Sequence, residues 1–76
     1  MEHHHHHPVE NETEMKALLE YTLKHNVSHT EELEYMAQQL EQQGNKDASD
    51  LLERAAEEYK KGNALLFEAL NKMKES

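Results

Sequence analysis

The chain has 76 residues, a formal net charge of −8 and no cysteine, so it forms one domain at most and holds neither disulfides nor thiolate metal sites. The negative charge would be repelled by phosphate backbones and by anionic lipid surfaces, so we expect no nucleic-acid partner and no membrane partner. One proline, two glycines and no isoleucine favour helix almost throughout, and the lack of an apolar run of ~20 residues leads us to expect a cytoplasmic protein.

A histidine-rich polar tail comes first, and we place it at residues 1–11. His3 to His7 are consecutive, and Pro8 follows them directly. Two interpretations of this run stay open: a purification tag, or a native arm that collects metal ions. In either case the tail has too little to bury, so we expect it to be disordered without metal. The rest, residues 12–76, is then a single helical domain.

A helix is predicted over residues 12–25. Asn11 and Glu14 have the spacing of a capping box at its start. Asn26 can adopt the left-handed conformation that ends a helix. Between these signals, apolar residues recur at helical spacing: Met15, Leu18, Leu19 and Leu23.

A second helix is predicted over residues 29–43. Ser28 and Glu31 match another capping box, and Gly44 is a typical residue just after a helix end. An alternative stays open, because one helical stripe keeps its phase through both segments. Its members are Leu18, Thr22, His25, His29, Leu33, Met36 and Leu40. We favour a break or kink at Asn26–Ser28 over a single long helix with the two histidines on its inner face.

The last predicted helix covers residues 46–74, with Asn45 as its N-cap. Its apolar stripe continues at spacings of three and four: Ala48, Leu52, Ala55, Tyr59, Gly62, Leu66, Leu70 and Met73. Inside a helix, Gly62 costs roughly 1 kcal/mol relative to alanine, and its place on the stripe suggests that another backbone or side chain packs closely there. A stop at Gly62–Asn63 is the alternative to one long helix.

These elements predict an all-α fold, a small antiparallel helical bundle, with two long helices forming a hairpin as the alternative. In the antiparallel register, residues whose numbers sum to roughly 89 lie side by side. That register brings Glu57, Glu58 and Asn63 near residues 25–32. The core of such a bundle is thin, and a homodimer would cover the apolar stripe that remains. A different protein partner would do the same.

Two histidines and a glutamate carry the one chemical signal in the chain. His25 and His29 are four residues apart and Glu32 follows three later, so all three project from one side of a helix. The four-residue spacing lets two imidazoles bind one metal ion. Neutral imidazole with carboxylate suits Zn, Ni or Co better than Ca or Mg. We therefore predict a metal site on these three residues, completed by a glutamate oxygen from the last helix.

The predicted function is non-enzymatic binding of a transition metal, as a buffer or a delivery accessory. The segment HTEEL does not match HExxH, so it indicates no zinc protease, and we assign no catalytic residue and no other cofactor. The competing interpretation is a helical interaction module without a metal role. In that interpretation His25 interacts with a helix terminus and His29 is an ordinary surface residue.

The segment HNVSHTEEL, with EYKKGN later, resembles a group of short helical-hairpin proteins of uncharacterised function from anaerobic bacteria and archaea. In that group a His-rich N-terminal arm precedes an H-N-x-x-H-x-x-E-L stretch, and K-G-N lies in the last helix. The resemblance covers about residues 14–74 and implies handling of nickel, cobalt or zinc. The arm of this chain departs from the group, because its five histidines are unbroken rather than alternating with glutamate. The residues that the resemblance carries over are His25, Asn26, His29, Glu32, Gly62 and Asn63.

Overall fold

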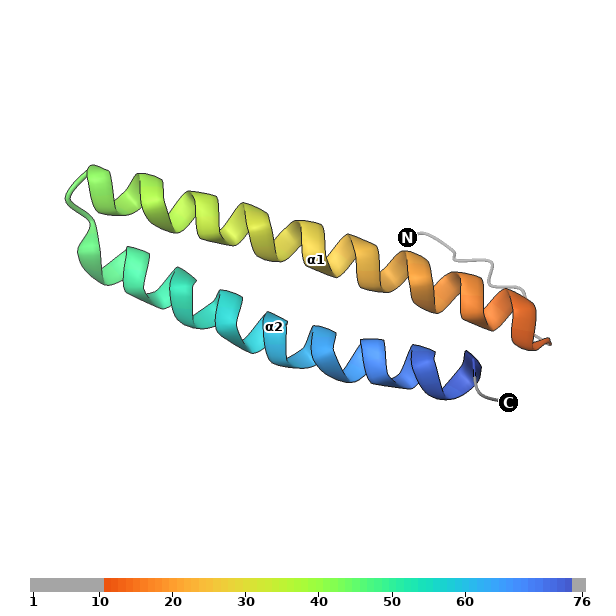
Figure 1. The fold of residues 1–76 in the computed structure, drawn as a ribbon. Coiled ribbons are helices and arrows are strands. Elements are labelled where there is room, and N and C mark those ends of the chain that lie inside the picture. The colour runs from red at the N-terminus through yellow and green to blue at the C-terminus, as the bar shows by residue number, and fades with distance from the viewer. Residues whose placement is uncertain (1–10, 75–76) are drawn as a thin grey trace, which may run out of the picture.

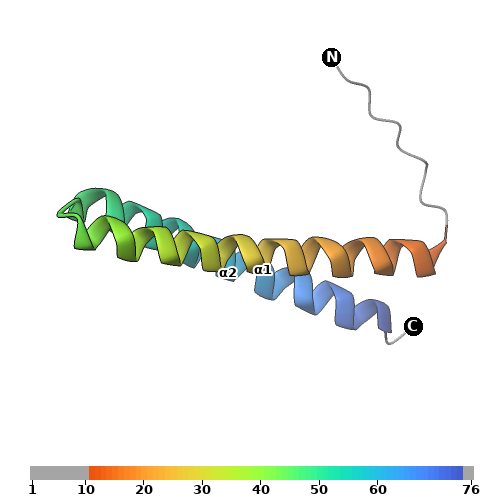
Figure 2. The ribbon, with the colours of Figure 1, turned by 90° about the horizontal axis from the view of Figure 1, so that it is seen from above.

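The computed structural model describes residues 11–74, which form two α-helices joined by a tight turn (Figure 1). Helix α1 spans Glu12–Gln42 and helix α2 spans Lys46–Lys74. They run antiparallel, side by side, and cross at a shallow angle when seen from above (Figure 2). The predicted all-α fold is confirmed, and of its two versions the hairpin of two long helices is the correct one.

Helix α1 is continuous, so the predicted break at Asn26–Ser28 is wrong, and the predicted helices 12–25 and 29–43 are one helix. The segment contains neither glycine nor proline. The hydroxyl of Thr30 donates to the carbonyl oxygen of Asn26 at 2.9 Å, a bond that threonine makes one turn back within a helix. Packing along the whole of α1 outweighs the local capping signal, since tertiary contact supplies most of a helix's stability.

Helix α2 and the start of α1 agree with the sequence predictions. The side chain of Asn11 accepts the backbone N–H of Glu14 at 2.8 Å, which is the predicted N-cap. Helix α2 passes through Gly62–Asn63 without interruption, so the alternative stop is absent and one long helix is confirmed. Nearly all of the predicted tail, residues 1–10, lies outside the described residues, as do residues 75–76.

The turn between the helices follows from one glycine. Gly44 has a φ of +86°, a conformation that residues with a Cβ rarely adopt. Its N–H donates to the carbonyl of Glu41 at 3.0 Å, and the N–H of Asn45 donates to the carbonyl of Leu40 at 2.8 Å. This is the Schellman pattern, which satisfies the last carbonyls of α1. The chain therefore reverses within a few residues, and α2 must run antiparallel to α1.

The helices meet through small and polar side chains. Ala37, Ser49 and Ala56 are each 1% exposed. The hydroxyl of Ser49 donates to the carbonyl oxygen of Ala37 at 2.8 Å, which ties the two helices together near the turn. Farther along, Asn63 Nδ2 donates to Oγ1 of the buried Thr30 at 3.3 Å. Side chains of this size let the two backbones approach closely but bury little apolar area.

A surface ion pair also joins the two helices. Nζ of Lys60 lies 2.7 Å from a carboxylate oxygen of Glu34, and both side chains are close to half exposed. The hydrogen bond and charge of Glu34 raise the pKa of Lys60 above its ordinary value. On the alkaline side, the pair therefore stays intact until the pH rises through that raised pKa. Because it is exposed, it contributes little to stability.

The tight contact at Ala56 can be tested by enlarging the side chain. We expect Ala56→Leu to lower the free energy of unfolding by about 1–3 kcal/mol, because a larger side chain would force the helices apart. Ala64→Leu, at an exposed position of the same helix, is the matched control and should change little. Urea unfolding followed by circular dichroism measures both. Equal effects of the two substitutions would show that the helices are not in close contact at Ala56.

The polar contact between Thr30 and Asn63 makes a second prediction. Thr30→Val removes the acceptor and leaves the amide of Asn63 without its partner, at a cost of about 1 kcal/mol. Replacing both partners, as in Thr30→Val with Asn63→Leu, should recover that loss, because no unpaired polar group remains. The same unfolding experiment reads out both variants. If the loss of stability in the double variant equals the sum of the losses in Thr30→Val and Asn63→Leu alone, the hydrogen bond does not couple these positions.

Candidate functional site

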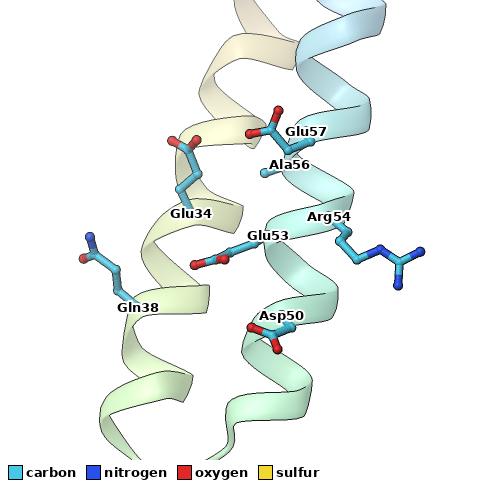
Figure 3. Close-up of a pocket in the computed structure, with 7 residues that line it drawn as sticks. All are labelled: Glu34, Gln38, Asp50, Glu53, Arg54, Ala56 and Glu57. Atoms are coloured by element: carbon cyan, nitrogen blue, oxygen red, sulfur yellow. The ribbon is translucent and has the colours of Figure 1, made fainter.

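One side of the hairpin carries an acidic groove between the helices. Its volume is about 640 Å³, and in Figure 3 Glu53 reaches from α2 toward α1 while Arg54 points away. Lys60 bridges this side, because its Nζ also lies 3.7 Å from a carboxylate oxygen of Glu57. The groove thus holds part of the negative charge of the chain, and Lys60 pairs with two of its glutamates, Glu34 and Glu57. Its lining residues are Glu34, Gln38, Asp50, Glu53, Arg54, Ala56 and Glu57.

The other side has a different character, which we call the uncharged face. It is defined by the stripe of α1 through residues 18, 22, 25, 29, 33, 36 and 40 and by the stripe of α2 through residues 48, 52, 55, 59, 62, 66, 70 and 73, neither of which contains Asp, Glu, Lys or Arg. At 100° per residue, the stripe of α1 lies on one flank of the contact residues Thr30 and Ala37, and Glu34 and Gln38 lie on the other. At the same 100° per residue, the stripe of α2 and Glu53 lie on opposite flanks of the contact residues Ser49 and Ala56.

A second groove lies on the uncharged face. Its volume is about 440 Å³, and most of its lining is apolar. Ala55, Tyr59 and Leu66 of α2 supply that apolar lining, and Gly62 lies among them. Glu58 is the one charged residue among those that line it. The complete lining is Asn26, Ala55, Glu58, Tyr59, Gly62, Asn63 and Leu66.

Large apolar side chains are left outside the core. Among residues 11–74 the buried apolar residues are Ala37, Ala56 and Leu70, whereas ten large hydrophobic residues are exposed. Three of these ten belong to the two stripes of the uncharged face: Leu18, Met36 and Tyr59, which are 48%, 46% and 45% exposed. The hairpin by itself therefore leaves unburied the side chains that would contribute most to a hydrophobic core.

The predicted metal ligands lie next to one another on the exposed surface of α1. The rings of His25 and His29 meet edge to face with centroids 5.0 Å apart. Nδ1 of His29 lies 3.2 Å from Oε1 of Glu32, with both side chains more than half exposed. Tyr21 stacks on His25 with centroids 5.9 Å apart. The histidines are therefore not on an inner face that is covered by α2.

Of the two glutamates that the sequence register brings near residues 25–32, Glu58 lines the uncharged groove together with Asn26. Glu57 lines the acidic groove, on the opposite side from the histidines. Asn63 reaches the neighbourhood of residues 25–32, but it donates to Thr30. Within residues 11–74, no group of three or more His, Cys, Asp and Glu side chains is arranged to hold a metal ion. Metal binding at His25, His29 and Glu32 stays a prediction.

Apolar periodicity does not predict the uncharged groove, because it indicates that the apolar stripe of α1 faces α2. The inner face is instead marked by Thr30 and Ala37, which pack against α2. A signal for this was present in the small residues Ser49 and Ala56 of α2, spaced seven apart, since small residues at helical spacing allow close approach. This signal of two small residues is weaker than the apolar stripe, so apolar periodicity alone selects the wrong side of the helix as the one that faces its neighbour.

The hydropathy of the helices and the comparisons with known proteins bear on the class and the family of this chain. Neither helix has an apolar stretch of the length and composition needed to cross a bilayer. No curated protein and no solved structure matches the chain. A family described as a domain of unknown function, DUF8180, matches residues 15–73. Because this match covers nearly all of both helices, the chain belongs to the DUF8180 family, and the antiparallel helical hairpin is its fold in this protein.

Proposed function

We propose that this protein is a helical interaction module, which binds an apolar surface of another helical protein through its uncharged face. One observation carries the proposal: apart from Leu70, the residues that the hairpin buries are small, whereas Leu18, Met36 and Tyr59 stay about half exposed on the uncharged face. Patches of this kind on a small protein are typical of binding surfaces. In this proposal the protein acts by binding and not by catalysis.

The energetics favour a helical partner. Complete burial of a large apolar side chain stabilises by roughly 1.5–3 kcal/mol, so covering the remaining half of several of them contributes several kcal/mol. The uncharged groove lies along α2, with Asn26 of α1 also in its lining, and the side chains of a second helix pack into grooves on a helix surface. All 16 acidic residues of the chain lie off the two stripes, and Glu58 is the one charged residue in the lining of the uncharged groove, so a partner can approach this face with little charge repulsion.

Site-specific photo-crosslinking in producing cells tests this function. Tyr59, on the uncharged face, is replaced by p-benzoylphenylalanine, and the matched control carries the same replacement at Tyr35, which lies off the stripe and is 61% exposed. We expect covalent adducts from position 59 and few from position 35, although position 35 is the more exposed. Adducts of equal yield at the two positions would show that the uncharged face is not a preferred binding surface.

A second candidate function, transition-metal binding, is favoured by the contact between the two imidazoles. Centroids of His25 and His29 only 5.0 Å apart are compatible with both rings turning toward one ion. Glu32 beside Nδ1 of His29 is placed to orient that ring, because an imidazole that donates one N–H to a carboxylate presents its other nitrogen to a metal. Zn, Ni and Co are the ions that such donors suit, and the resemblance described above implies the same metals.

Calorimetric titration tests the metal candidate. Because His3–His7 would bind these ions by themselves, all proteins compared carry serine at those five positions. We expect Zn²⁺, Ni²⁺ or Co²⁺ to bind this protein but not its His25→Ala/His29→Ala variant, and Glu32→Gln to weaken binding by about tenfold. Binding should fall on acidification, because only neutral imidazole is a ligand. Identical titrations of the parent and the double variant would eliminate the metal site.

A further inference from the structure

We propose that the partner of the uncharged face is a second copy of this chain, and that the two copies form an antiparallel four-helix bundle in which Tyr59 of each copy packs over Gly62 of the other. This inference rests on the proposed interaction function and identifies its partner. It is carried by the position of Gly62, by the symmetry of α2 about its middle, and by the size and charge of the face.

Gly62 has no role within a single hairpin. A glycine inside a helix is destabilising by roughly 1 kcal/mol relative to alanine. A Cβ added at Gly62 would meet no atom within 4 Å, so no packing inside the hairpin requires glycine there. Its backbone does not require it either, because Gly44 is the one glycine with a positive φ. A residue without a side chain at this position lets another molecule approach the backbone closely.

The surroundings of Gly62 form a hole of the kind that accepts a large side chain. Gly62 lies in the uncharged groove with Ala55 and Leu66 along the same helix. Tyr59 lines this groove one turn earlier and is 45% exposed, so its ring is available to a neighbouring molecule. The groove thus presents a knob and a hole side by side, as interdigitating helices require.

The knob and the hole are placed symmetrically on the helix. Tyr59 and Gly62 flank the middle of α2, which spans Lys46–Lys74. When two α2 helices pack antiparallel about a two-fold axis midway between Tyr59 and Gly62, half a residue from this middle, residues equally far on either side of the axis meet. Tyr59 of one copy then lies over Gly62 of the other, and the reverse contact forms by symmetry. The two turns lie at opposite ends of the bundle, and α1 of each copy packs against α1 of the other.

The size and charge of the face suit this partner. A helix of 29 residues is about 44 Å long at 1.5 Å per residue. Two adjacent helices, each about 10 Å wide, thus offer roughly 900 Å² per copy, close to the contact area of an ordinary stable interface. A net charge of −8 per chain opposes association through the acidic side. The bundle leaves both acidic grooves facing solvent on its two outer sides, where screening by salt reduces the repulsion.

Sedimentation equilibrium of the full chain, again with serine at positions 3–7, measures the association. We expect a species of twice the 8.9 kDa chain mass. Gly62→Leu should weaken dimerisation by at least about tenfold, because the leucine fills the space that Tyr59 of the other copy occupies. Ala64→Leu, at an exposed position off the stripe, should leave the dimer intact. Circular dichroism establishes that both variants stay helical, so a loss of association cannot be ascribed to unfolding.

Disulfide trapping tests the register, since the chain has no cysteine of its own. A mixture of Tyr59→Cys and Gly62→Cys proteins should form a disulfide-linked pair on mild oxidation. Asn45→Cys, in the turn, should form none, because the two turns lie at opposite ends of the bundle. Rapid linkage of Asn45→Cys, or a dimer that Gly62→Leu leaves unchanged, would overturn the proposed packing.

Failure of this inference can be told apart from failure of the interaction function. A chain that stays monomeric at all concentrations excludes a second copy as the partner. If position 59 then still gives adducts in cells with a different protein, the interaction function stands and only the identity of the partner changes. If position 59 gives no adducts and the chain is monomeric, both proposals fall.

Discussion

Close contact between two helices through small side chains is the constraint on which the rest of this molecule depends. Ala37, Ser49 and Ala56 leave almost no space between the backbones, and the hydroxyl of Ser49 donates across the gap to a carbonyl oxygen of α1. This contact fixes the rotation of each helix about its own axis. Apart from Leu70, which is 5% exposed, the fully buried residues are small, so the hairpin has an interface without a large apolar core.

That rotation gives the hairpin two unlike sides. Glu34, Glu53 and Glu57 line the acidic groove on one side, and the two stripes without charged residues form the other. A single hairpin with so little buried apolar area is marginal, since small domains bury a smaller fraction of their surface than large ones. Association through the uncharged face would supply the missing burial, so folding and binding would be coupled in the same surface.

The histidine pair lies on the uncharged face but takes no part in the contact between the two helices. His25 and His29 share the stripe of α1 with Leu18 and Met36, and their rings touch each other on the exposed surface. Because the histidines belong to the stripe that defines the uncharged face, a metal ion bound to them would lie in the interface between the two copies. A metal ion at the histidines would bring positive charge to a chain of net charge −8, which would favour association of two copies. The two candidate functions are thus compatible, and the experiments above separate them.

Local chemistry in the sequence determined the helical class, the cap at Asn11, the turn at Gly44 and the antiparallel register, because each depends on a few neighbouring residues or on chain geometry alone. It also grouped His25, His29 and Glu32 on one side of a helix, where the structure finds them in contact. Only the tertiary structure decided that α1 continues through Asn26–Ser28 and that the histidines face away from α2. The physical reason is that a capping box and an apolar stripe are compatible with more than one arrangement. The close packing of Thr30, Ala37 and their partners on α2 selects one of them.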